Sequence, residues 1–125
     1  MLDTSVLIAS WRPPETDEYA ISIVSLAEMH LGVLRAAGTP ELTARLRRLS
    51  EVEHEFEPIP VDRRVARSYA ECAQAVAAAG RSHRPRVFDL LIAATARVEE
   101  ARLYTLNPDD FRGLEGLLEV VSPAG

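Results

Sequence analysis

The sequence has no lysine, a single cysteine and no long apolar run, and each of these absences excludes a class of protein. The lone Cys72 excludes an internal disulfide and a thiolate metal cage. No apolar stretch approaches the roughly 20 residues that a membrane span needs. The opening MLDTSVLIAS has no basic leader typical of a secretory signal or transit peptide. We therefore expect a soluble, cytoplasmic protein, and a length of 125 residues predicts a single domain over residues 1–125.

All 14 basic side chains are arginines, and the formal net charge is -5. This balance argues against a protein that coats nucleic acid by bulk electrostatics, but not against one that binds it locally. Arginine suits bidentate contacts with phosphate, although an arginine bias in the host would also remove lysine. We expect the first two of three arginine groups on solvent-exposed helix faces and the third in a loop. The groups are Arg45, Arg47 and Arg48, then Arg63, Arg64 and Arg67, then Arg81, Arg84 and Arg86.

Apolar segments of strand length alternate with helical patterns along the chain. Residues 2–9 predict a buried strand that runs into a short helical turn. Strands alternating with helices imply a parallel sheet covered on both faces, which is a three-layer α/β/α fold. A short apolar stretch lies at residues 19–24. Further strands are predicted at residues 56–61, 103–106 and 117–121, and helices at residues 26–38, from 39 onward, 63–79 and 87–100.

Six polar side chains lie where predicted strands run into loops or helices. In an open α/β sheet, such positions converge beyond the carboxyl ends of the strands. Each acid alone has a simpler explanation, because the helix dipole favours a carboxylate in a first turn by about 0.3 to 1 kcal/mol. The six candidates are Asp3, Glu28, Asp89, Asn107, Asp109 and Asp110.

Two of these acids, Asp3 and Asp89, stand alone inside the most apolar segments of the chain. Ionised carboxylates are rarely buried without a counter-charge, and the nearest arginines lie in separate loops. A bound cation is a natural neutraliser. Carboxylates without clustered His or Cys select hard ions, chiefly Mg²⁺ or Mn²⁺. Such ions activate water and stabilise charge on a phosphoryl oxygen, which predicts phosphodiester hydrolysis.

Four spaced motifs resemble PIN-domain ribonucleases, and most closely the VapC-like toxins of bacterial type II toxin–antitoxin modules. The motifs occur in the family's order through nearly the whole chain. They are Leu2-Asp3-Thr4-Ser5-Val6-Leu7, Ser25-Leu26-Ala27-Glu28 with Gly32, Phe88-Asp89-Leu90-Leu91-Ile92-Ala93-Ala94-Thr95-Ala96, and Thr105-Leu106-Asn107-Pro108-Asp109-Asp110-Phe111.

The resemblance implies a PIN-like fold and a metal-dependent endoribonuclease. In it, Asp3, Glu28 and Asp89 would bind Mg²⁺, for which Mn²⁺ can substitute, and would orient the attacking water. Asn107 stands where the family has a fourth acid, so a second metal is in question, and Asp109 or Asp110 is left to compensate.

The same resemblance assigns three hydroxyls, those of Thr4, Ser5 and Thr105, to the site as substrate contacts. Their simpler explanation is as turn and cap residues. Arg84 and Arg86 precede Asp89 directly, so their loop is either an RNA-backbone contact or a solvated loop.

Partners are also implied by the resemblance rather than by composition. They are an RNA substrate, a VapB-like antitoxin whose C-terminal segment lies over the site, and a second copy in a homodimer that forms a larger complex with antitoxin. Only Met1 and Leu2 precede Asp3, so either the true start lies upstream or the sheet tolerates a short first strand. Trp11 and Tyr19 either stack on RNA bases or pack on the core.

Three rival classes are weighed against this hypothesis. A haloacid-dehalogenase-like phosphatase would need a second Asp two residues after Asp3, where Ser5 stands. A response-regulator receiver domain would need a lysine. The remaining alternative is a catalytically silent PIN-like module that binds RNA or protein, which the presence of all three acids disfavours.

Overall fold

A narrow parallel sheet runs through the computed structural model, which describes residues 1–14 and 18–123. Strands β1 (Leu103–Tyr104) and β2 (Val120–Val121) pair in parallel. Single parallel bridges join Leu2 to Tyr104 and Ser22 to Ile59. A backbone bond of 2.8 Å from the Leu2 N–H to the carbonyl of residue 20 links these pairs. The order across the sheet is therefore Ile59, Ser22, Leu2, Tyr104 and Val121, and the predicted parallel sheet is confirmed.

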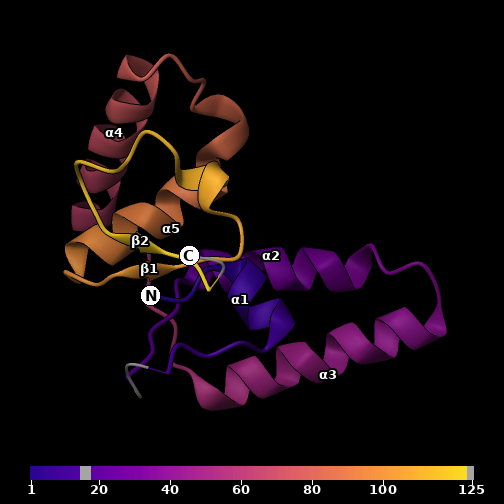
Figure 1. Ribbon diagram of the computed structural model, residues 1–125. Helices are drawn as coiled ribbons and strands as arrows, with labels where there is room; N and C mark the ends of the chain where they lie inside the picture. The colour runs from indigo at the N-terminus through magenta and orange to yellow at the C-terminus, as the bar shows by residue number, and fades with distance from the viewer. Residues whose placement is uncertain (15–17, 124–125) are drawn as a thin grey trace.

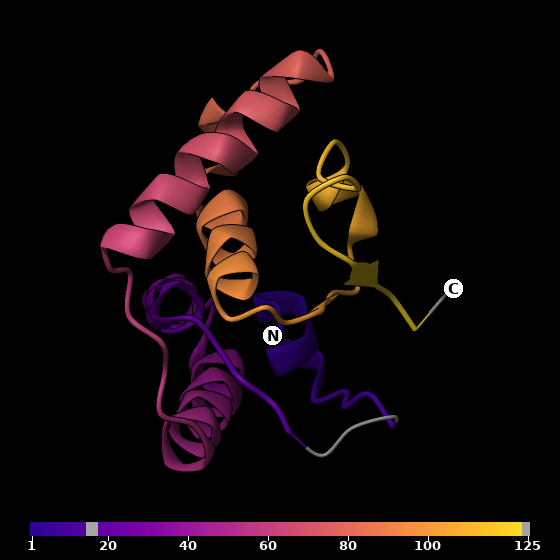
Figure 2. The ribbon, with the colours of Figure 1, turned by 90° about the vertical axis from the view of Figure 1, so that its left-hand side faces the viewer.

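Helices cover both faces of this sheet (Figure 1). Helices α2 and α3 form a two-helix arm that projects to one side, while α4 lies along α5 (Figure 2). None of these helices, in the part of the chain described, is long and apolar enough to cross a membrane. Their bounds are α1 (Thr4–Ala9), α2 (Ile23–Leu34), α3 (Thr39–Glu55), α4 (Arg63–Ala78) and α5 (Val87–Val98), with short 3-10 turns η1 (Arg84–Arg86) and η2 (Pro108–Phe111).

Side-chain alternation along the strands builds two cores. Met1 and Leu103 pack with the buried faces of α4 and α5. Leu2 and Tyr104 point the other way and pack with α1, α2 and α3 in a second cluster, the lower core. Because successive strand residues face opposite sides, Asp3 and Thr105 return to the side of Met1 and Leu103.

The strand predicted to run into a helical turn over residues 2–9 is present, but it is shorter than expected, because α1 already begins at Thr4. Only residues 1–3 are extended and pair with β1. A short apolar run suits a strand or a buried helix equally well, and periodicity alone does not separate the two. The early helix buries Val6 and Leu7 on one side and leaves Ile8 exposed.

Other boundaries follow their sequence signals. The Asp62 side chain accepts the Val65 N–H at 3.0 Å and caps α4. Gly80, with a φ of 79°, ends the same helix. In the predicted strand at residues 56–61 only Ile59 pairs, because Pro58 and Pro60 have no N–H to donate.

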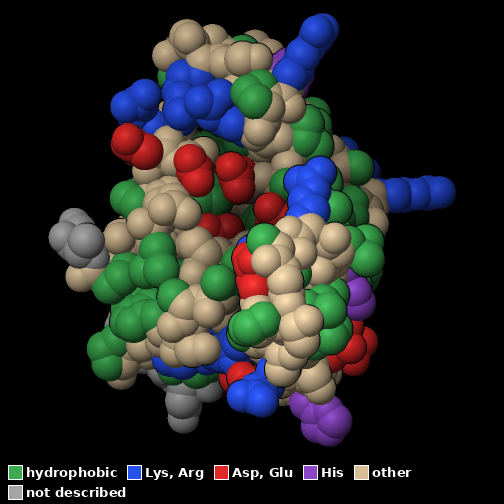
Figure 3. All heavy atoms as spheres, turned by 90° about the vertical axis from the view of Figure 1, so that its right-hand side faces the viewer, with side chains coloured by type: hydrophobic (Ala, Val, Ile, Leu, Met, Phe, Trp, Pro, Cys, Tyr) green, Lys and Arg blue, Asp and Glu red, His purple; other side chains and the backbone are tan. Residues whose placement is uncertain are grey.

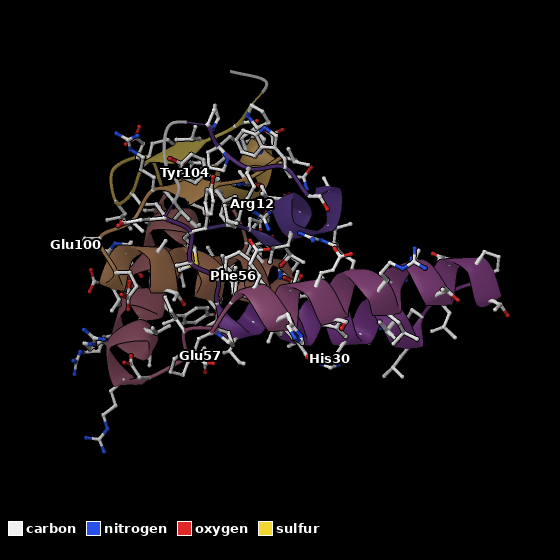
Figure 4. The ribbon with its side chains drawn as sticks, turned by 90° about the horizontal axis from the view of Figure 1, so that it is seen from below. Arg12, His30, Phe56, Glu57, Glu100 and Tyr104 are labelled. Atoms are coloured by element: carbon white, nitrogen blue, oxygen red, sulfur yellow. The ribbon has the colours of Figure 1, made fainter. Side chains whose placement is uncertain are left out.

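Trp11 and Tyr19 are partly buried and pack against the core cluster that contains Leu2 and Tyr104. The ring of Trp11 lies 6.2 Å from that of Tyr104. The Arg12 guanidinium lies 5.4 Å from the centre of the Phe56 ring (Figure 4). It also forms two hydrogen bonds of 3.0 Å with Glu55 at the end of α3. These contacts fasten the segment after α1 to the lower core.

Candidate metal centre

Strand register places Asp3 beside Thr105 at the carboxyl ends of neighbouring parallel strands. The Asp3 N–H donates to the Tyr104 carbonyl at 2.9 Å. Asp3 is only 4% exposed and Thr105 is fully buried. The Thr105 hydroxyl donates to Oδ2 of Asp3 at 2.8 Å, and the Ser5 hydroxyl donates to the same oxygen at 2.9 Å. Two hydroxyls therefore fix the orientation of one carboxylate.

The loop after β1 holds these two hydroxyls in turn. The backbone N–H of Leu106 donates to Ser5 Oγ at 3.0 Å. The N–H of Asn107 donates to Thr105 Oγ1 at 2.9 Å. Each hydroxyl accepts from the backbone and has its proton left for Asp3, so both are oriented toward the carboxylate.

Glu28 enters from the second turn of α2 and is held by a hydroxyl of α1. Thr4 donates to Glu28 Oε1 at 2.6 Å, and Thr4 Oγ1 lies 3.1 Å from Ser25 Oγ. Burial raises the pKa of Glu28, the Thr4 hydrogen bond lowers it, and the charge of Asp3 raises it. Ser25, fully buried behind Thr4, was not among the predicted site residues. Its place in the Ser25–Glu28 motif was the only signal for it.

Asp89 lies in the first turn of α5, and its pKa is raised from 3.8 to about 7. Burial is the largest cause, followed by the charges of Asp3, Asp110 and Glu28, while the charge of Arg86 lowers this pKa. A helix dipole would lower this pKa, and its stabilisation of roughly 0.3 to 1 kcal/mol is smaller than the cost that burial and the neighbouring acids impose on the ionised carboxyl. The helix dipole alone therefore does not explain why a carboxylate occupies this position.

The turn after β1 brings one of its two acids to the cluster. Turn η2 packs against α5, and the charge of Asp110 acts on Asp89. The Asp109 side chain is 90% exposed and lies 3.8 Å from the Arg112 guanidinium. Asn107 is exposed, and it is its backbone N–H that reaches Thr105. Of the candidates for the fourth acidic position, Asp110 is the one close to the other acids.

Arginines border the acidic cluster. A cavity of about 270 Å³ is lined by Glu28, Arg84 and Asp89 together with the apolar residues of the η1–α5 junction. Arg86 is half-buried and donates to the Ser82 carbonyl at 2.7 Å. Figure 3 shows acidic side chains gathered in a hollowed face with arginine side chains at its edge.

A second cavity adjoins Glu28, and it corrects the expectation for one arginine group. Arg45 and Arg48 were expected on the solvent face of α3, yet both line a cavity of about 370 Å³ that also touches Glu28, Met29 and Gly32. The Arg48 side chain is 17% exposed and donates to the Leu7 carbonyl at 2.6 Å. Helical periodicity did not reveal this, because only part of the leucine stripe of α3 is buried: Leu49 is 6% exposed, whereas Leu46 is 47% exposed.

The acidic cluster suits a hard divalent cation by charge and by donor type. Within residues 1–14 and 18–123, however, no three Asp, Glu, His or Cys side chains already stand around a common point. The hydrogen bonds explain this geometry, because Asp3 is turned toward Thr105 and Glu28 toward Thr4. Burial and the charges of Asp3, Asp110 and Glu28 raise the pKa of Asp89, as expected where a cation would neutralise neighbouring acids.

The chain belongs to the PIN-domain family, which matches residues 1–117. Among curated proteins, it is 39% identical to ribonuclease VapC5 of Mycobacterium tuberculosis, over 96% of this chain and 90% of that protein. It is 35% identical to ribonuclease VapC4 of the same organism, over 74% of this chain and 68% of that protein. The resemblance carried by the four motifs is thereby confirmed.

Solved structures agree with this assignment. The VapBC-5 toxin–antitoxin structure from M. tuberculosis matches with a TM-score of 0.81 and 38% identity, over 97% of this chain and 94% of that one. FitAcB from Neisseria gonorrhoeae matches with a TM-score of 0.78 over 98% of this chain and 96% of that one. At 23% identity, that second likeness concerns the fold alone.

Proposed function

We propose that this chain is a VapC-type toxin, a Mg²⁺-dependent endoribonuclease that hydrolyses RNA phosphodiester bonds in the cytoplasm. The observation that carries the proposal is the convergence of Asp3, Glu28 and Asp89 from separate parts of the chain, where burial and the repulsion from Asp3, Asp110 and Glu28 raise the pKa of Asp89 to about 7. A divalent cation relieves that repulsion. The ribonuclease names of the relatives that match most of this chain support the same activity.

In this proposal Asp3, Glu28 and Asp89 are the metal ligands, and Asp110 supplies the fourth acid. Its proximity to Asp89 favours it over Asp109, whose side chain points into solvent. Asn107 contributes a backbone N–H to the network and no charge. Bound Mg²⁺ would stabilise negative charge on a phosphoryl oxygen and lower the pKa of a coordinated water.

Thr4, Ser5 and Thr105 were predicted as substrate contacts, and their surroundings support a different role. Thr105 is fully buried and Thr4 is 8% exposed. Their hydroxyls are engaged with Glu28 and Asp3. We assign all three to orienting carboxylates, because a ligand held by a hydrogen bond presents its free oxygen in a fixed direction.

Arg84 and Arg86 remain the candidates for RNA contact. Arg84 is exposed and lines the cavity next to Asp89, where a phosphate beside the scissile bond would lie. Arg86 is half-buried and its charge acts on Asp89. Guanidinium groups at the edge of an acidic site attract the RNA backbone while the metal neutralises the acids.

The proposal includes a VapB-like antitoxin and a homodimeric toxin. The VapBC-5 structure that this chain resembles is described as a toxin–antitoxin system. The cavity lined by Met29 and Arg45 opens beside Glu28. An antitoxin segment could therefore pack there and place an arginine on the acidic cluster, in the position of the metal.

Mapping RNA 5′ ends in cells tests this function and identifies the target RNA in the same experiment. Wild type and Asp89→Ala are expressed briefly, and new 5′ ends are sequenced. The proposal expects a small set of new ends with wild type alone, suppressed by co-expressed antitoxin. A catalytically silent binding module would give the same ends in both samples.

A further inference from the structure

Arg81 lies outside the acidic cluster and ties the turn that carries Asp110 to the end of α4. Its Nη1 nitrogen donates to two backbone carbonyls, that of Asp109 at 3.0 Å and that of Arg112 at 2.7 Å. Asp109 lies within η2 and Arg112 directly follows it, so one guanidinium binds the backbone on both sides of Asp110 and Phe111. Hydrogen bonds from a charged donor are stronger than those between neutral groups.

The backbone beneath Arg81 is itself held in place. Gly80 adopts a left-handed conformation with a φ of 79°, and the Arg81 N–H donates to the Val76 carbonyl at 3.0 Å. This is a helix C-terminal cap that fixes the direction of the next residue. The side chain of Arg81 therefore leaves a rigid support.

A second contact fixes the same turn from the other end. Gly113, with a φ of 104°, lies so close to α4 that an added Cβ would come within 3.3 Å of the Ala79 Cβ. Its N–H donates to the Glu115 carboxylate at 2.9 and 3.1 Å. Arg81 and Gly113 thus dock η2 against α4 while η2 also packs on α5.

We propose that Arg81 is a positioning residue, which fixes η2 so that Asp110 faces the metal-binding acids. The inference rests on the function proposed above and refines it. The arginines of the third group, Arg81, Arg84 and Arg86, then have two different functions. Arg84 and Arg86 lie beside the cavity next to Asp89, whereas Arg81 holds backbone carbonyls and acts on the protein rather than on RNA.

The two roles of an arginine predict different kinetics. A residue that contacts RNA changes KM and its salt dependence, because each lost phosphate contact on a single strand lowers the slope of log affinity against log salt by about 0.7. A positioning residue changes kcat, because a displacement of about 1 Å at a reacting group costs up to a hundredfold.

The experiment compares Arg81→Ala and Arg81→Lys with Arg112→Ala, which removes one guanidinium from the same turn without touching the two carbonyl bonds. Amide hydrogen exchange of residues 110–114 and Mn²⁺ affinity are measured without RNA. Cleavage of a synthetic RNA that spans the site mapped in cells is measured separately. The first two measurements test Arg81 even if the chain cuts no RNA.

We expect Arg81→Ala to speed amide exchange in the turn at least about tenfold, weaken Mn²⁺ binding and lower kcat about tenfold or more with KM within twofold. Combined with Asp110→Asn, it should cost little more than either change alone. Arg81→Lys retains the positive charge, so its kcat should lie between those of Arg81→Ala and wild type. Unchanged exchange with a higher KM and a flatter salt dependence, or equality with Arg112→Ala in all measurements, would overturn the proposal.

Discussion

Thr105 donates its hydroxyl proton to Oδ2 of Asp3 across 2.8 Å, although the two residues are 102 positions apart in the sequence. The bond exists because the segment of Asp3 and strand β1 run in parallel, with Leu2 opposite Tyr104. It joins the first strand to β1 and holds a candidate ligand at the carboxyl edge of the sheet.

Replacement of Thr105 by valine keeps the shape of the side chain and removes this bond. The buried Asp3 carboxylate and the Asn107 N–H each lose a partner. We expect about 1 to 3 kcal/mol of lost stability in urea unfolding and a tenfold to hundredfold weaker Mn²⁺ affinity by calorimetry, both approximate ranges.

Thr43→Val is the matched control, since Thr43 lies on the exposed face of α3. It should leave both quantities within error of wild type. If Thr105→Val bound Mn²⁺ as tightly as this control does, the hydroxyl would have no part in orienting Asp3.

The raised pKa of Asp89 predicts a pH-dependent stability in the metal-free protein. Its carboxyl has an ordinary value of 3.8 and a folded value of about 7. Its stabilising contribution is therefore complete below pH 3.8 and is lost as the pH rises through 7. Asp89→Asn does not titrate and escapes this loss.

We expect Asp89→Asn to gain about 1 to 2 kcal/mol over wild type between pH 5 and pH 8, after allowance for partial exposure of the group. Urea unfolding in EDTA measures it. Saturating Mg²⁺ at pH 8 should stabilise wild type far more than the variant. A difference between the two proteins that does not vary with pH would contradict the shifted pKa.

Asp109 and Asp110 form a natural matched pair, since they are adjacent acids in one turn. Asp110→Asn should weaken Mn²⁺ binding and lower the pKa of Asp89, because a neighbouring negative charge is lost. Asp109→Asn removes the same charge from a side chain that is 90% exposed and should change neither. Calorimetry and ¹³C NMR titration of the carboxyl groups give both quantities. Equal effects of the two changes would remove Asp110 from the site.

Much of the fold was predictable, because alternation of strand and helix patterns defines a parallel sheet without knowledge of any contact. The capping Asp62 and the left-handed Gly80 also marked the ends of α4 correctly. The start of α1 was not predictable. Val6 and Leu7 suit a buried helix as well as a strand, and only packing against the rest of the lower core decides between them.

The candidate site, like the fold, was predictable from the sequence only in part. Lone acids in apolar segments singled out Asp3 and Asp89, since burial of charge needs a compensating partner. Nothing in the sequence distinguished Asp109 from Asp110, because the direction of each side chain depends on how η2 docks on α4 and α5. The carbonyl bonds of Arg81 were hidden for the same reason, since backbone acceptors leave no pattern in the sequence.

Cleavage by purified protein tests directly whether Asp3 and Asp89 hold a metal that cuts RNA. Wild type, Asp3→Asn and Asp89→Asn are incubated with structured RNA in Mg²⁺ or in excess EDTA, after circular dichroism has verified that all three are folded. We expect wild type to cleave the RNA in Mg²⁺ but not in EDTA, and both variants to cleave it at least about a hundredfold more slowly. Equal cleavage by all three proteins, or cleavage by wild type that persists in excess EDTA, would contradict this expectation.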